Sequence, residues 1–262
     1  MKRVLPALLL AALPNLSFAH DTWLLPDRWR VAVGEAQGFT LTSGMAFPAP
    51  ETAVKADRLA ARSLRLAGQK TPLDPGASDR ALHLSAGTKG EGVAVAWITT
   101  RERSLTLTPK QVEEYLAEIG ATEAVGPAWK KSGQTAWRET YVKLAKTFVR
   151  VGGADDRSWA EPVGLALELV PTSDPTRLKV GDTLGLNLVS KGQPLPDFAV
   201  GVVPAPPAQA RLLRTDAQGR LSVTLDRSGP LMFRVTLIRP SSARPGEWES
   251  AFTTLTLEVQ AR

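Results

Sequence analysis

The sequence predicts a mainly β protein made of two β-sandwich domains, the first of which carries a short helical insertion. Short apolar runs alternate with polar residues at a period of two along most of the chain. Glycine and proline separate these runs at short intervals, as turn residues do. Hydrophobic residues make up 43% of the 262 positions, which is enough to build packed cores rather than a disordered chain.

Residues 1–19 are interpreted as a signal peptide that is removed on export. Two basic residues open the chain, an apolar run covers 4–13, and Ser17 and Ala19 place small side chains at the −3 and −1 positions of the cleavage site. The apolar run is shorter than the ~20 residues that span a membrane, and no later segment approaches that length. We therefore expect an exported protein without a transmembrane segment, located in the periplasm, whose mature chain begins at His20.

The first predicted domain covers residues 20–160 and opens with short strands. These strands are expected at 29–33, 39–42, 63–66, 82–84 and 93–98. Turn residues, among them Gly34, Gly68 and Gly90, lie between them. Short strands at regular spacing are typical of a β-sandwich.

A helical insertion is predicted in the later part of this domain. Thr108 and Pro109 have the character of an N-cap and a first-turn proline, and Gly120 ends the apolar helical spacing that follows them. A second helix is predicted over residues 134–148, where an apolar stripe is read at helical spacing. Both helices are expected to pack on one face of the first domain.

The strand pattern returns in the second predicted domain, residues 161–262. Strands are expected at 165–170, 184–188, 199–203, 221–225, 233–237 and 252–259. Their number and the length of the segment are those of one immunoglobulin-like or transthyretin-like sandwich. A hinge between the domains is expected at 152–162, where adjacent glycines and acidic residues interrupt regular structure.

The composition excludes several classes of function. The chain has no cysteine, so disulfides, thiolate metal sites and cysteine nucleophiles are ruled out. Lysine and arginine total 32 against 26 acidic residues, a net charge of +6, but they are scattered, so nucleic acid is not an expected partner. Two histidines, one of them at the predicted mature terminus, do not specify a serine–histidine–acid triad.

A metal-site hypothesis follows from the predicted mature N-terminus. The free α-amine and ring Nδ1 of His20 can close a six-membered chelate ring around one ion. Such nitrogen ligands suit Ni, Co and Cu, so a transition metal ion of this group is the expected ligand. Asp21 offers a neighbouring carboxylate, and His83 is the other histidine. His20, Asp21 and His83 are therefore the candidate metal ligands, although solvated surface groups are the plain alternative for each.

Three functions remain open on these residues. The first is an exported protein that captures or delivers Ni, Co or Cu through His20. The second is a metal-free binding or structural module whose sandwiches present loops to a partner. The third is a copper oxygenase with a histidine brace, which requires His20 and His83 to meet at one ion.

The order of several motifs resembles the DUF4198 family. His20–Leu24 resembles its "AH-D/E-x-W-L" opening, residues 138–146 resemble its "R-E-x-Y-x-x-x-A-K" helix, and residues 167–171 resemble its "LELVP" segment. The sequence "TDAQG" at Thr215–Gly219 resembles the family's carboxypeptidase-regulatory-like second domain. The resemblance implies an exported two-sandwich protein linked with nickel and cobalt uptake in the periplasm. A membrane metal transporter is the partner that it implies.

Overall fold

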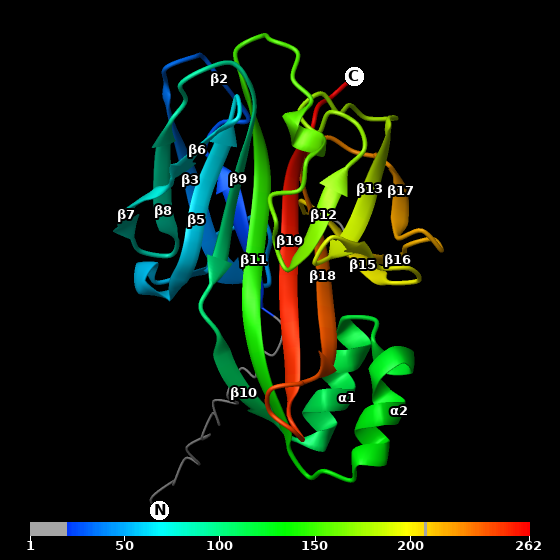
Figure 1. The fold of residues 1–262 in the computed structure, drawn as a ribbon. Helices are drawn as coiled ribbons and strands as arrows, with labels where there is room; N and C mark the ends of the chain where they lie inside the picture. The colour runs from blue at the N-terminus through cyan, green and yellow to red at the C-terminus, as the bar shows by residue number, and fades with distance from the viewer. Residues whose placement is uncertain (1–19, 207–208) are drawn as a thin grey trace, which may run out of the picture.

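The computed structural model describes residues 20–206 and 209–262 and confirms a mainly β fold (Figure 1). The segment interpreted as a signal peptide lies outside the described residues. Three sheets, of five, ten and four strands, make up the molecule, and two α-helices lie together at one end of it. None of the helices within the described ranges is long and apolar enough to cross a membrane.

The five-stranded sheet contains the first strand of the fold. Its strands are β1 (Asp21–Pro26), β3 (Ala36–Gly44), β4 (Thr52–Ala53), β7 (Asp74–Ser78) and β8 (Leu82–Gly87). They follow the order β1-β3-β8-β7, with β4 paired to β3. Burial alternates along β8, where Leu82 and Leu84 are buried and His83 is exposed. The expected orientation of His83, away from the local core, is confirmed.

The ten-stranded sheet runs through the middle of the molecule. Its strands are β2 (Arg30–Val31), β5 (Leu59–Leu66), β6 (Gln69–Pro72), β9 (Gly92–Thr100), β10 (Arg103–Leu107), β11 (Trp137–Val151), β15 (Ala199–Pro204), β16 (Arg211–Arg214), β18 (Gly229–Pro240) and β19 (Trp248–Val259). The path is β16-β15-β18-β19-β11-β9-β5-β6, with β10 and β2 paired to β11. Because β11 pairs in parallel with β19, this sheet joins residues from both sides of the predicted boundary at 160/161.

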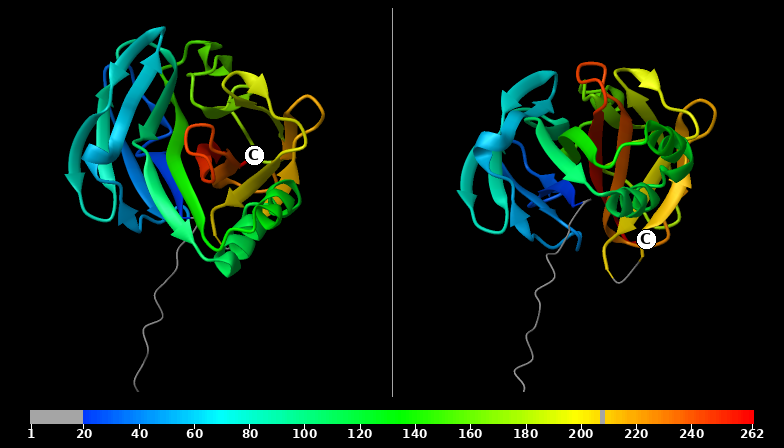
Figure 2. Two further views of the ribbon diagram at one scale, coloured as in Figure 1. Left: turned by 60° about the horizontal axis from the view of Figure 1, so that its bottom comes forward. Right: turned by 90° about the horizontal axis from the view of Figure 1, so that it is seen from below.

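The four-stranded sheet and the helices complete the fold. The sheet contains β12 (Leu167–Pro171), β13 (Thr183–Ser190), β14 (Gln193–Pro194) and β17 (Arg220–Thr224). The helices are α1 (Pro109–Glu118), α2 (Thr122–Ser132) and the short 3₁₀ turns η1 (Ala56–Arg58) and η2 (Ser158–Ala160). The five-stranded and four-stranded sheets lie on opposite sides of β11 and β19 (Figure 2).

Strands β9 and β11 contribute to two hydrophobic cores at once. On β9, Val93 and Val95 pack with residues of the four-stranded sheet, whereas Ala94 and Ala96 pack with residues of the five-stranded sheet. This division follows from the strand geometry, in which successive side chains point to opposite faces. On β11 the alternation repeats, with Phe148 in the first core. The two sides of the molecule are therefore tied together through shared central strands.

The first predicted helix is confirmed. Helix α1 begins after Thr108, whose hydroxyl accepts a hydrogen bond from the Gln111 backbone N–H while the Gln111 side chain accepts from the Thr108 N–H. This reciprocal capping box satisfies two backbone donors that the first turn leaves free. Gly120, which follows the last turn, has a φ of 69°, a conformation that glycine adopts at little cost.

The prediction of a second helix over residues 134–148 is wrong, because residues 137–148 belong to strand β11 and residues 134–136 precede it. Apolar residues on both faces of the strand are buried, since each face meets its own core. A strand buried on both faces loses its period of two and can be read as a helical stripe. The "R-E-x-Y-x-x-x-A-K" motif therefore lies on a strand. The second helix is α2, which lies earlier in the chain.

Candidate functional site

Hydrogen bonds from the central sheet hold the segment that carries His20. The residue directly precedes β1, and β1 pairs with β3 on one side. On its other side the hydroxyl of Thr254 donates to the Thr22 carbonyl at 2.6 Å, and the hydroxyl of Thr256 donates to the Leu24 carbonyl at 2.5 Å. Both threonines lie on β19 and are buried. The start of the predicted mature chain is thus fixed to the middle of the fold.

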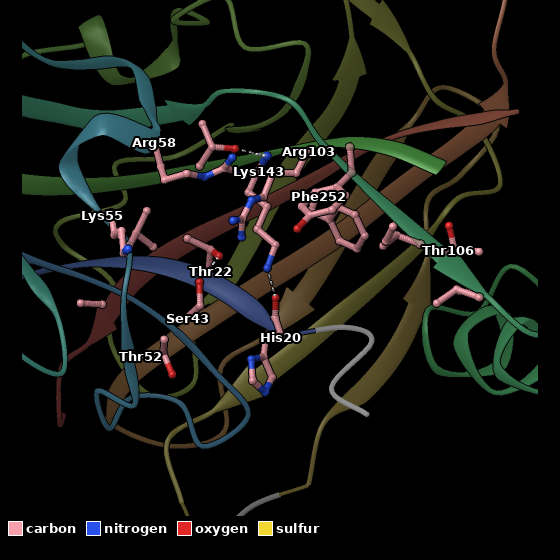
Figure 3. A pocket seen from close by; sticks show the side chains of 16 residues that line it. His20, Thr22, Ser43, Thr52, Lys55, Arg58, Arg103, Thr106, Lys143 and Phe252 are labelled. Carbon is pink, nitrogen blue, oxygen red and sulfur yellow. Dashed lines mark hydrogen bonds between the residues drawn. The ribbon is translucent and has the colours of Figure 1, made fainter. Parts of the chain in front are cut away.

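His20 lines a cavity of about 540 Å³ (Figure 3). The cavity lies between the beginning of β1, the segment around η1, and strands β10 and β11. Its volume is in the range of sites for small organic ligands. The lining residues are His20, Thr22, Ser43, Thr52, Ala53, Val54, Lys55, Arg58, Thr100, Arg103, Leu105, Thr106, Leu107, Tyr141, Lys143 and Phe252.

The charged side chains of this lining are all basic. Lys55, Arg58, Arg103 and Lys143 contribute four cations, and no aspartate or glutamate lines the cavity. None of the four forms an ion pair with an acidic residue in the described part of the chain. Charges of one sign in a cleft with low-dielectric walls concentrate an attractive field for the opposite sign. The cavity therefore favours an anionic ligand.

Lys143 connects this cationic lining to His20. Its ammonium donates a hydrogen bond to the His20 carbonyl at 2.6 Å (Figure 3). Burial lowers the pKa of Lys143 to about 8; Asp21 opposes this decrease and the Arg58 charge adds to it. A lowered pKa means that the surroundings do not fully compensate the ammonium charge.

Arg58 has a similar environment. Burial and the charge of neighbouring Arg103 lower the pKa of Arg58, while Tyr141 and Asp57 oppose the change. Its Nη2 donates to the Arg101 carbonyl at 3.2 Å. A guanidinium remains charged at neutral pH. Arg58 and Arg103 therefore repel each other at the cavity wall, and an anion between them would relieve this repulsion.

The His20 imidazole favours its neutral form. Burial and the Lys143 charge lower the pKa of His20, and Glu51 and Asp21 oppose the change. A neutral imidazole has a free nitrogen lone pair, which is the form that binds a metal. Glu51 is the nearby acid that the sequence did not indicate, although its Oε1 already accepts from the backbone N–H groups of Met45 and Ala46.

Asp21 lies beside His20 but outside the cavity. Its Oδ2 accepts a hydrogen bond from Arg234 Nη1 at 2.8 Å, and Glu118 lies 3.5 Å from the same nitrogen. Burial raises the pKa of Asp21, and the contact with Arg234 opposes this increase. Successive residues of a strand point to opposite faces, so the Asp21 carboxylate is directed to Arg234 rather than to the His20 imidazole.

His83 is placed on another strand and is not brought to His20. Asp21 pairs with Gly44 on one side of β3, and His83 pairs with Thr40 on the other side. Four residues along β3 correspond to ~13 Å, and two strand spacings add ~10 Å across the sheet. A histidine brace needs both imidazoles within ~2 Å of one ion. The arrangement therefore offers no support to the copper oxygenase hypothesis.

The protein itself supplies few metal ligands at this site. Within the described ranges, no group of three or more histidine, cysteine, aspartate or glutamate side chains is placed to hold a metal ion. After cleavage His20 would supply two nitrogens, its amine and its imidazole. Thr22, Ser43 and Thr52 also line the cavity, so hydroxyl groups and molecules from outside the protein are the candidates for further ligands of an ion at His20.

The sequence alone did not indicate the four basic residues. Lys55 lies just before η1 and Arg58 within it, whereas Arg103 and Lys143 lie far along the chain on β10 and β11. No local pattern distinguishes Lys55, Arg58 or Arg103 from other surface cations. Lys143 is flanked by apolar Val142 and Leu144 in a segment rich in charged residues, so its neighbours do not distinguish it either.

The protein is thus mainly β, with a cationic cavity at the start of strand β1. The chain belongs to the DUF4198 family, because the model "Domain of unknown function (DUF4198)" matches residues 17–239. No curated protein matches the sequence.

Several solved structures are similar to this chain at low identity. The D0-D1 domain of Intimin is 10% identical, with a TM-score of 0.23, covering 90% of this chain and 97% of that one. Latent PorU from Porphyromonas gingivalis is 10% identical, with a TM-score of 0.21 and coverage of 95% and 19%. An Escherichia coli alpha-2-macroglobulin activated by porcine elastase is 10% identical, with a TM-score of 0.23 and coverage of 93% and 20%. Similarity at this level carries no functional inference.

Proposed function

We propose that the protein is exported, is cleaved before His20, and binds a transition metal ion, Ni, Co or Cu, through the new N-terminus. The single observation that supports this proposal is the position of His20, the predicted first residue, in the wall of a cavity of about 540 Å³. The α-amine created by cleavage and the imidazole together form a chelating pair. Nitrogen donors of this kind favour the later first-row divalent metals.

The electrostatics around His20 are compatible with this role. The lowered pKa of its imidazole keeps the ring nitrogens available near neutral pH. An α-amine has a pKa of ~7.7–8.0, so metal binding displaces its proton and weakens as the pH falls. Neither donor requires a carboxylate from the protein.

The cellular role that we infer is metal uptake or delivery in the periplasm, with a membrane metal transporter as partner. The resemblance in motifs supports this role, since the opening His20–Leu24 fits the family's first motif. We further infer that the molecule consists of two immunoglobulin-like or transthyretin-like sandwiches that share the central strands. The support for this inference is that β11 contributes Phe148 and Leu144 to the core between the ten-stranded and four-stranded sheets.

Calorimetric titration of the mature protein with Ni²⁺ and Cu²⁺ tests the metal site. The protein is produced by export, and its intact mass confirms that the chain begins at His20. The control is the same chain with one methionine before His20, which moves the α-amine away from the imidazole. The proposal predicts one-to-one binding that the added methionine abolishes, and equal binding by both proteins would contradict it.

A metal-free binding module is the second candidate. The observation that favours it is the all-basic charged lining of the cavity, which attracts anions and repels a bare cation. Absence of Ni²⁺ and Cu²⁺ binding in the titration above, with ligand binding in the cavity retained, would favour this candidate over the metal site.

A further inference from the structure

The cationic lining of the cavity opposes binding of a positively charged metal ion at His20. A divalent ion at His20 would lie close to the Lys143 ammonium, which is bonded to the His20 carbonyl. Arg58, Arg103 and Lys55 line the same cavity, and none of its lining residues is acidic. The field of four cations opposes the entry of a bare cation. Negative charge from outside the protein would therefore strengthen binding of the metal.

The number of donor atoms leads to the same conclusion. His20 provides two nitrogens, and no cluster of acidic or histidine side chains in the described part of the chain completes a coordination sphere. Four to six ligands are usual for the later divalent metals. Oxygen atoms of a bound carboxylate could fill the remaining positions and also neutralise the cations of the cavity wall.

The lining indicates what kind of anion fits. Arg58, Arg103 and Lys143 lie near one another on the wall, whereas Lys55 lies apart from them, so the positive charge faces the cavity from two places (Figure 3). Leu105, Leu107 and Phe252 add apolar surface to the same cavity. A carbon framework that carries several separated carboxylates matches this distribution better than one compact phosphate does. Arginine and lysine also form strong charge-assisted hydrogen bonds with carboxylates.

We propose that the cavity beside His20 binds a small organic anion with two or more carboxylates, and that the metal ion enters as a complex with this anion. The anion site stands on the cavity alone, whereas the complex rests on the proposed function of His20. Arg58, Arg103, Lys55 and Lys143 contact the carboxylates, and the His20 nitrogens take coordination positions that the anion leaves open.

Calorimetry on the mature full-length chain tests this inference with three separate titrants. These are sodium citrate, nickel chloride and the one-to-one nickel–citrate complex, all at one pH and ionic strength. Arg103→Gln and Lys55→Gln each remove one exposed cation of the wall. Lys130→Gln is the matched control, because it removes one exposed cation from α2, outside the cavity. Thermal unfolding curves verify that every variant is folded.

The inference predicts that citrate alone binds one-to-one and that Arg103→Gln and Lys55→Gln each weaken this binding by about tenfold, as expected for loss of one charge-assisted contact. Lys130→Gln leaves it unchanged. The complex is expected to bind at least tenfold more tightly than citrate or nickel alone, and a methionine added before His20 removes this advantage.

The possible failures are distinguishable. If nickel binds through His20 and citrate does not bind at all, the anion inference is overturned and the proposed metal site stands. If citrate binds through the basic residues but neither nickel nor its complex depends on His20, the anion site is supported and the proposed metal function fails. If Lys130→Gln and Arg103→Gln lose citrate affinity equally, citrate responds only to the net charge of the protein, and the anion site is overturned.

Discussion

Two lysines three residues apart on β11 have opposite surroundings. Lys146 is 2% exposed, and its ammonium lies 2.7 Å from the Glu168 carboxylate, which is 1% exposed. Lys143 lies on the other face of the strand, is partly exposed, and donates to the His20 carbonyl within the cavity. Burial lowers the pKa of both lysines. Lys146 has a carboxylate as its partner, whereas Lys143 does not.

The difference distinguishes a structural charge from a charge available for binding. Glu168 also accepts hydrogen bonds from the backbone N–H groups of Val163, Gly164 and Leu165, so the ion pair joins β11 to the segment before β12. A buried pair with such additional hydrogen bonds is complete within the protein. The region around Lys143 lacks an equivalent acid, which makes it the place where an external anion gains most.

The largest expected effect on stability comes from Lys146, the lysine that is paired with a carboxylate. Lys146→Met leaves the Glu168 carboxylate buried without its counter-charge, so we expect a loss of roughly 3–5 kcal/mol in the free energy of unfolding. Urea denaturation measures this loss. The double variant Lys146→Met/Glu168→Gln removes both charges and should recover part of it, because the amide oxygen can still accept from Gly164 and Leu165 while the amide nitrogen cannot accept from Val163. A single variant as stable as the wild type would contradict the structural role of the pair.

A second buried acid, Glu139 on β11, allows a test with an effect of intermediate size. Glu139 accepts hydrogen bonds from Trp137 Nε1 at 2.6 Å and Tyr115 Oη at 3.3 Å, and also from the Ser250 hydroxyl. Glu139→Ala leaves these buried donors without an acceptor, and we expect unfolding free energy to fall by roughly 1–3 kcal/mol. Glu139→Gln is the control, since an amide oxygen can accept from Trp137 while both hydroxyls rotate to accept from the amide nitrogen.

The pH dependence of Glu139→Gln sharpens this test. Burial raises the pKa of Glu139, and the hydrogen bonds from Ser250, Trp137 and Tyr115 oppose the increase. A carboxyl with a raised pKa in the folded state contributes stability that is present below the ordinary value of ~4.3 and is lost as the pH rises through the raised value. The wild type should therefore lose stability relative to Glu139→Gln across this interval. Parallel stability curves for the two proteins would exclude the raised pKa.

The smallest expected effect on stability comes from Lys143, the lysine that lines the cavity. Lys143→Met removes an ammonium that has no carboxylate partner, so we expect the unfolding free energy to change by no more than ~0.5 kcal/mol, or to increase. The same variant should weaken citrate binding by about tenfold. Chemical denaturation and calorimetry measure the two quantities on one sample. A large loss of stability without any loss of binding would assign Lys143 a structural role like that of Lys146.

The parts of this account that the sequence predicted are those encoded locally. The mainly β fold follows from alternating runs, and α1 follows from Thr108, Pro109 and the helical spacing behind them. His20 was proposed as a metal ligand because its position after the predicted cleavage site would give it a chelating amine, and the structure places it at a cavity. Each of these signals lies within a few adjacent residues.

The remaining features depend on contacts between distant segments. Strand β11 was mistaken for a helix because both of its faces are buried, which only the packing of the two outer sheets reveals. Arg58 and Arg103 become neighbours through the pairing of β5 with β9 and of β10 with β11. The sequence also could not predict that Asp21 would be directed to Arg234. Long-range pairing, not composition, creates the cationic cavity.

The most direct test of the contrast between the two lysines is nuclear magnetic resonance of their side-chain Cε–Hε groups during addition of citrate. Lys143→Arg and Lys146→Arg assign the two signals in the mature protein. The account predicts that the Lys143 signal shifts in a saturable manner while the Lys146 signal stays in place, because only Lys143 faces the cavity without a carboxylate partner. A Lys143 signal that does not respond to saturating citrate would contradict the claim that this cavity binds an anion.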